Sequence, residues 1–151
     1  PNAKRSVSAA TDLGEGVTLW RTDRRRTAGQ FALTLIACAN RSNARARVAV
    51  LLIDNAPGQR LGKTGCLRQV MNVLCGRVVL VYQPAYSPDL QPEERLWRQW
   101  RPNVTHNHRR ATIEALIQDS DAWFERLREE PASVLPMLGL SPARLPECLA
   151  A

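Results

Sequence analysis

The chain has 151 residues, with 21 Lys and Arg against 14 Asp and Glu, which gives a formal net charge of +7. This length fits one domain, and the 44% of hydrophobic residues is enough for one packed core, so the composition excludes a disordered chain. No apolar run approaches the roughly 20 residues of a membrane-spanning helix, and the sequence shows no secretory signal. The basic charge balance makes nucleic acid the leading class of partner.

The four cysteines and two histidines do not form a recognisable metal or disulfide framework. No two cysteines make a C-x-x-C pair, so we expect core thiols in a cytoplasmic, reducing environment. His106 and His108 are too few to complete a zinc site of the His/Cys type. They also lie too close together in the sequence for the spread-out members of a ββα-metal nuclease centre.

The first elements predicted along the chain form a β-hairpin. Residues 7–11 and 16–22 have the alternation of strands, and residues 12–16 supply turn-forming residues between them. The polar, basic residues 1–6 are expected to form a loose tail.

A helix is predicted next. Thr27 and Gln30 match a capping box, with a hydroxyl at the N-cap and an amide three residues later. Apolar residues follow at helical spacing, with Phe31, Leu35 and Cys38 on one stripe. We expect this helix to end near Asn40 and a basic linker to occupy residues 41–47.

Two buried strands are predicted in the middle of the chain. Residues 48–53 are apolar throughout, which is typical of a strand buried on both faces at the centre of a parallel or mixed sheet. Residues 67–74 have a short helical pattern, and residues 77–82 form a second apolar strand. The alternation of strand and helix predicts an α/β fold, a mixed sheet with covering helices.

Two helices are predicted in the last part. Pro92 suits the first position of a helix, where Glu93 and Glu94 complement the dipole, and Pro102 should weaken this helix. A final helix begins near Thr112, carries an apolar stripe and ends before Pro131. Residues 140–151 are expected to be a loose tail of a single domain spanning residues 1–151. Three tryptophans are assigned to the core by their apolar helical neighbours: Trp97, Trp100 and Trp123.

Asp54 and the glutamates of the Pro92 helix are the candidate functional acids. Asp54 follows the apolar strand at its carboxyl end, where open α/β sheets build their sites, although its side chain could equally cap the next turn. Glu93 and Glu94 point about 100° apart on a helix, so only one can face Asp54 well. Periodicity does not choose between them, and both could simply be surface acids.

Two segments carry a resemblance to a known family. Residues 52–58 (LIDNAPG) and residues 86–97 (YSPDLQPEERLW) stand in the right order, each after an apolar strand. They resemble the catalytic domain of DDE transposases of bacterial insertion sequences related to the mariner group. The resemblance extends from about residue 7 to residue 139.

This resemblance implies an RNase H-like fold that holds two Mg²⁺ or Mn²⁺ ions through three carboxylates. Asp54 then matches the second acid of the family and Glu94, rather than Glu93, the third. Two metal ions activate the attacking oxygen and stabilise the leaving one when a phosphodiester is cut or joined in line. The implied partners are the DNA of transposon ends and target, with a homodimer as the assembly and the bacterial nucleoid as the location.

The chain also departs from the family pattern. The family's first acid lies on an earlier strand, and neither Asp12 nor Asp23 matches it. Gln59 stands where the family usually has a histidine, and no helix-turn-helix domain is present. We therefore expect a truncated catalytic domain that lacks the first strand of its sheet. The rival hypothesis is a catalytically inactive DNA-binding or dimerising remnant.

Other motifs predict phosphate contacts rather than nucleotide hydrolysis. Gly62, Lys63 and Thr64 resemble the end of a P-loop, but Pro57 occupies the position of its first glycine, so no nucleotide cofactor is expected. Five basic residues are the candidate contacts to the DNA backbone: Arg60, Lys63, Arg95, Arg109 and Arg110.

Overall fold

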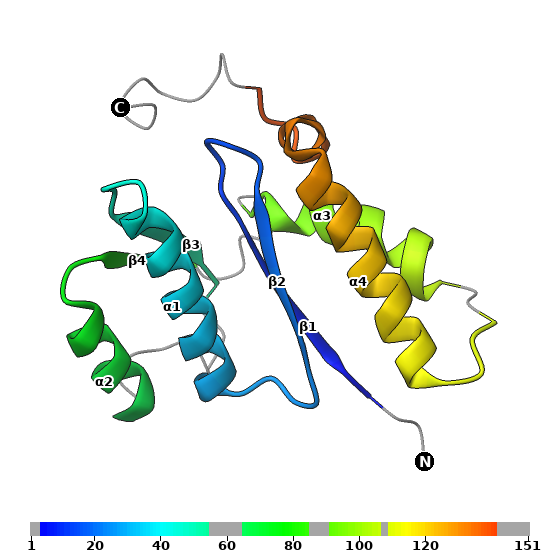
Figure 1. Ribbon diagram of the computed structural model, residues 1–151, viewed down its shortest axis with the longest axis horizontal. Helices are drawn as coiled ribbons and strands as arrows, with labels where there is room; N and C mark the ends of the chain where they lie inside the picture. The colour runs from blue at the N-terminus through cyan, green and yellow to red at the C-terminus, as the bar shows by residue number, and fades with distance from the viewer. Residues whose placement is uncertain (1–3, 55–64, 85–90, 107–108, 142–151) are drawn as a thin grey trace. The chain divides into compact units, whose positions relative to one another are not determined.

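The computed structural model describes residues 4–54, 65–84, 91–106 and 109–141. They divide into two compact units, each described by itself: a central unit, Asp23–Gln91, and a split unit, which combines Pro1–Thr22 with Pro92–Ala151. The elements, in chain order, are β1 (Ser6–Thr11), β2 (Thr18–Asp23), α1 (Ala28–Asn43), β3 (Ala49–Ile53), α2 (Gly65–Leu74), β4 (Val78–Tyr82), α3 (Glu93–Trp100), η3 (Arg101–Thr105), α4 (Ile113–Glu129), η4 (Pro131–Ser133) and α5 (Val134–Met137) (Figure 1). The mixed α/β composition expected from the sequence is confirmed.

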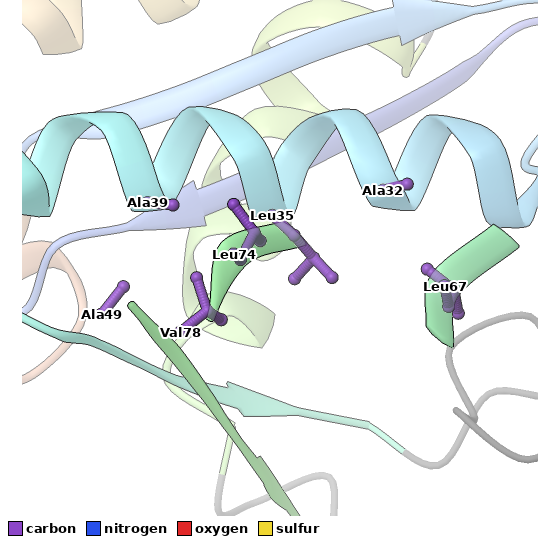
Figure 2. Close-up of a cluster of buried hydrophobic side chains, with 7 residues drawn as sticks. All are labelled: Ala32, Leu35, Ala39, Ala49, Leu67, Leu74 and Val78. Carbon is purple, nitrogen blue, oxygen red and sulfur yellow. The ribbon is translucent and has the colours of Figure 1, made fainter. Parts of the chain in front are cut away.

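The central unit is built on two parallel strands. β3 and β4 pair in register from Ala49 opposite Val78 to Ile53 opposite Tyr82. The helices α1 and α2 pack against each other, and α1 contacts both strands. Figure 2 shows the buried cluster that results, with side chains from both helices and both strands: Ala32, Leu35, Ala39, Ala49, Leu67, Leu74 and Val78.

The prediction that both strands are buried on both faces is wrong for the described structure. Ala49 and Val78 lie in the cluster under α1 and α2, but Val50 and Val79 on the opposite face are 64% and 45% exposed. Successive strand residues point to opposite faces, and the helices of this unit cover only one of them. The prediction of one mixed sheet also differs from the structure, in which the described residues form two two-stranded sheets, β1–β2 and β3–β4.

The helix α1 begins as predicted and ends later. The Thr27 hydroxyl accepts from the backbone N–H of Gln30, and the Gln30 side chain accepts from the backbone N–H of Thr27, so the capping box is confirmed. The helix continues to Asn43, because Arg41 and its polar neighbours are compatible with an exposed helical turn. Its fully buried line is Ala32, Leu35 and Ala39, beside the stripe predicted through Phe31 and Cys38.

The cysteines of the central unit do not all lie in the core. Cys38 is partly buried, whereas Cys66 and Cys75 are exposed. The prediction of core thiols is therefore wrong for these two residues. Leu67 and Leu74 occupy the buried side of α2, which leaves Cys66 and Cys75 on the solvent side of its two ends.

The split unit contains the predicted hairpin. β1 and β2 form a two-stranded sheet, and the hydroxyls of Thr11 and Thr18 lie 3.1 Å apart across it. Asp12 closes the turn, since its carboxylate accepts from the backbone N–H groups of Gly14 and Glu15 at 2.9 and 3.2 Å. Residues 12–16 thus act as the turn that their composition predicted.

An aromatic core holds the hairpin to α3 and α4. The fully buried Phe124 stacks on Trp20 with ring centroids 5.4 Å apart, and it meets Trp97 and Trp123 edge to face. Trp123 is buried, and Trp97 and Trp100 pack partly buried against the same cluster. The assignment of these three tryptophans to the core is confirmed.

Pro102 ends α3 by changing the helix type. It has no N–H to donate to the carbonyl four residues earlier, so residues 101–105 form a π-helical turn with the bond from His106 N to Arg101 O at 2.8 Å. The side chain of Asn103 donates to the Gln99 carbonyl at 2.7 Å, and the Thr105 hydroxyl donates to the Arg101 carbonyl at 3.2 Å. The predicted weakening at Pro102 is confirmed.

The chain continues in an ordered form beyond Pro131. The helix α4 is capped by Thr112, whose hydroxyl accepts from Ala115 N at 3.2 Å, and it ends before Pro131 as predicted. Val134 and Leu138 of the following turns are buried in the aromatic core, and Leu140 packs against it. At the other end of the chain, Ser6 is already part of β1.

Candidate functional site

Asp54 lies at the carboxyl end of β3, as the sequence predicted. Its side chain is 38% exposed, and its Oδ2 atom lies 3.6 Å from an Nη2 atom of Arg26. Arg26 stands just before the Thr27 cap of α1, so the start of this helix and the end of β3 meet in the central unit. The Asp54 carboxylate is therefore partly exposed and forms an ion pair with the Arg26 guanidinium.

Gln83 is a neighbour of Asp54 that sequence reasoning missed. Its backbone N–H donates to the Ile53 carbonyl at 2.9 Å, which extends the β3–β4 ladder by one step beyond Tyr82. Gln83 is only 6% exposed, and the parallel register places it beside Asp54 at the same edge. A polar residue directly after an apolar strand was the signal in the sequence.

Glu93 and Glu94 occupy different environments in the first turn of α3. Both carboxylate oxygens of Glu93 are buried, and they face Thr11 of β1 without a hydrogen bond of good geometry. Burial raises the pKa of Glu93 above its ordinary value of 4.5, and the nearby hydroxyl and backbone of Thr11 oppose this only in part. Glu94 is half-buried. Asp54 belongs to the central unit, whereas Glu94 belongs to the split unit.

The basic residues that the sequence predicts to contact DNA lie in different surroundings. The guanidinium of Arg95 occupies the space that a side chain at position 139 would need. Arg110 is paired with Asp119, which offsets its charge, whereas Arg109 is exposed. Arg60 and Lys63 lie outside the described residues, as does Gln59.

A run of three arginines was not singled out in the sequence. Arg24, Arg25 and Arg26 are all exposed, and the last of them pairs with Asp54. Three adjacent arginines after a strand are visible in the sequence, but only the fold shows that the last of them, Arg26, lies beside Asp54.

The donor chemistry of Asp54 suits a hard divalent cation. Carboxylate oxygens are the ligands preferred by Mg²⁺, and the Asp54 side chain is 38% exposed. Within the four described ranges, no three Asp, Glu, His or Cys side chains gather into a metal-binding group. Asp54 and Glu94 each offer one carboxylate, in different units of the chain.

These features define an α/β protein with an acidic site at the carboxyl edge of parallel strands. A family model described as DDE superfamily endonuclease matches residues 2–117, a range that includes Asp54 and Glu94. The chain belongs to this superfamily. The match confirms the broad resemblance predicted from the two motifs. Comparisons with curated proteins and with solved structures gave no significant match.

Membership of this superfamily implies a transposase-type nuclease that acts on DNA, and such nucleases generally use divalent metal ions. Among the described residues, no helix combines the length and the apolar character needed to cross a membrane.

Proposed function

We propose that this chain is the catalytic part of a DNA transposase of a bacterial insertion sequence related to the mariner group. It cleaves DNA strands and transfers them to a target in a metal-dependent reaction. The observation that carries the proposal is Asp54, a partly exposed carboxylate at the carboxyl end of β3 that lies within the superfamily match. Transposon ends and target DNA are its partners, a homodimer is its assembly, and the bacterial nucleoid is its location.

Asp54 and Glu94 would hold Mg²⁺ or Mn²⁺, which supply charge stabilisation at the phosphorus and a more acidic attacking oxygen. Asp54 is fixed by the end of β3, whose carbonyl at Ile53 accepts from Gln83 N. Glu94 is fixed by the first turn of α3. Ligands on regular elements keep their positions better than ligands on loops, which suits an in-line displacement.

The environment of Glu93 supports the choice of Glu94 as the third acid of the family. Both oxygens of Glu93 are enclosed against β1, whose Thr11 they face. A metal ligand needs at least one accessible oxygen, and the buried Glu93 carboxylate offers none in this conformation. Glu94 is half-buried on the next helical position and points in another direction, so it is the candidate for the third acid.

The alternative function is that of an inactive DNA-binding or dimerising remnant. Its support is the sheet arrangement of the described residues, where β1–β2 and β3–β4 are separate pairs. These residues do not form the single mixed sheet expected of an RNase H-like catalytic domain.

Nicking of supercoiled plasmid DNA with Mg²⁺ or Mn²⁺ tests the proposal. We expect nicking by the wild-type chain and background levels for Asp54→Asn and Glu94→Gln. Glu93→Gln is the matched control on the adjacent residue, and it should retain the activity. Circular dichroism and DNA binding establish that each variant is folded. A folded, DNA-binding wild-type chain that does not nick supports the remnant instead, and loss of activity in Glu93→Gln but not in Glu94→Gln reverses the assignment of the third acid.

A further inference from the structure

Arg24, Arg25 and Arg26 place three positive charges just before the N-terminus of α1. These residues precede the N-terminus of α1, whose dipole disfavours nearby cations, and the first turn of α1 has no acidic residue. The ion pair between Arg26 and Asp54 is 3.6 Å long with both partners partly exposed, and such pairs contribute about 0–1 kcal/mol to stability. The three arginines are exposed, so their positive charge is available to an anion.

The side chain of Arg26 is well suited to bind a phosphate. The guanidinium presents a planar set of donors that matches two phosphate oxygens. Its side chain is 58% exposed, so a phosphate of a ligand in solvent can reach it. Arg24 and Arg25 are exposed beside it and add attraction for a polyanion.

We infer that Arg26 is a positioning residue that exchanges its ion pair with Asp54 for a phosphate of bound DNA when a divalent cation binds Asp54. The inference rests on the proposed function, since it uses Asp54 as a metal ligand. The exchange follows from charge: a divalent cation at Asp54 replaces the single charge of the guanidinium and repels it. The released guanidinium would then be available, beside Asp54, to a phosphate of bound DNA.

The first test is DNA affinity with and without a divalent cation. A fluorescently labelled duplex is titrated with the protein in EDTA and in Ca²⁺, which also prefers oxygen ligands. In Ca²⁺, Arg26→Gln should lower the affinity and reduce the salt slope by about 1, the effect of one phosphate contact. In EDTA the same variant should bind like the wild type. Arg25→Gln is the matched control, and its effect should be equal in both buffers.

The second test is Mn²⁺ binding without DNA, followed by electron paramagnetic resonance of the free ion. Arg26→Gln should bind Mn²⁺ more tightly than the wild type, because the competing guanidinium is gone. Asp54→Asn should lose the binding. Both substitutions are at exposed or half-exposed positions, and thermal unfolding verifies that the variants remain folded.

The outcomes separate this inference from the proposed function. Equal loss of DNA affinity by Arg26→Gln in both buffers, or no loss in either, overturns the exchange. Mn²⁺ binding that depends on Asp54 but is unchanged in Arg26→Gln also overturns the exchange and leaves the proposed function standing. Mn²⁺ binding that does not depend on Asp54 contradicts the proposed metal site, and the inference fails with it.

Discussion

The indole Nε1 of Trp20 donates a hydrogen bond of 3.0 Å to the Oδ1 atom of Asp121, which is 101 residues further along the chain. The Trp20 ring also stacks on Phe124, one helical turn after Asp121, and Arg128 lies 5.7 Å from the ring centroid. One side chain of β2 is thus held by three residues of α4. The split unit depends on this contact, because it joins the beginning of the chain to a helix near its end.

We predict that Asp121→Ala lowers the free energy of unfolding by about 1–3 kcal/mol, because a charge-assisted hydrogen bond is lost and a part-buried indole N–H is left without its acceptor. Urea unfolding measures the change. Trp20→Phe removes the donor and keeps an aromatic ring, so a double-mutant cycle isolates the pair. A coupling energy close to zero would show that the bond adds nothing.

The exposure of one face of β3 predicts unequal effects of truncation in the central unit. Leu35→Ala should cost about 2–5 kcal/mol, since Leu35 is fully buried in the cluster under the helices. Val50→Ala should change the free energy of unfolding by no more than about 0.5 kcal/mol, because its side chain is 64% exposed. Chemical denaturation of both variants makes the comparison. A large cost for Val50→Ala would mean that this face of the strand is covered.

Glu93 predicts a dependence of stability on pH. Its pKa is raised by burial, so the folded state favours the protonated carboxyl over the carboxylate. The contribution is most favourable below the unfolded pKa and is lost as the pH rises through the folded pKa. We expect Glu93→Gln to be more stable than the wild type at about pH 7 and to lose that advantage below about pH 4.5.

Unfolding in urea at both pH values checks this, with Glu94→Gln as the control at the neighbouring position. An advantage of Glu93→Gln that persists unchanged at the lower pH would contradict a raised pKa of Glu93 in the folded protein.

Two glycines with similar backbone angles predict different costs for the same substitution. Gly16 and Gly76 have φ values of +73° and +76°, so alanine at either position is strained by about 1–2 kcal/mol. A Cβ at position 16 would also collide with the backbone carbonyl of Pro131, whereas nothing lies within 4 Å of one at position 76. Gly16→Ala should therefore have a clearly lower melting temperature than Gly76→Ala. Equal melting temperatures would show that the close approach at Pro131 does not exist in solution.

Local signals in the sequence predicted most of the elements. The Thr27 capping box, the turn at Asp12 and the break at Pro102 each depend on residues a few positions apart, and all three are confirmed. These features are set by hydrogen-bond chemistry and by the missing N–H of proline, which neighbouring residues cannot easily change.

Features that depend on distant parts of the chain could not be predicted in this way. The apolar run at residues 48–53 does not show that only one face is covered, since that depends on where α1 and α2 pack. Helical spacing left Glu93 and Glu94 equivalent, and only the approach of Thr11 distinguishes them. The pairing of Arg26 with Asp54 likewise requires the start of α1 to meet the end of β3.

The division of the split unit between both ends of the chain has a consequence for biosynthesis. The central unit is contiguous, so all of its residues are synthesised before α3 and α4. At a rate of roughly 5–20 residues per second, Trp20 waits on the order of 5 to 20 seconds for Asp121, which is 101 residues behind it. Until Asp121 has been made, the Trp20 indole lacks its hydrogen-bond acceptor in α4, and the core of the split unit is incomplete. The central unit can therefore form first, and the split unit is completed only after α4 has been synthesised.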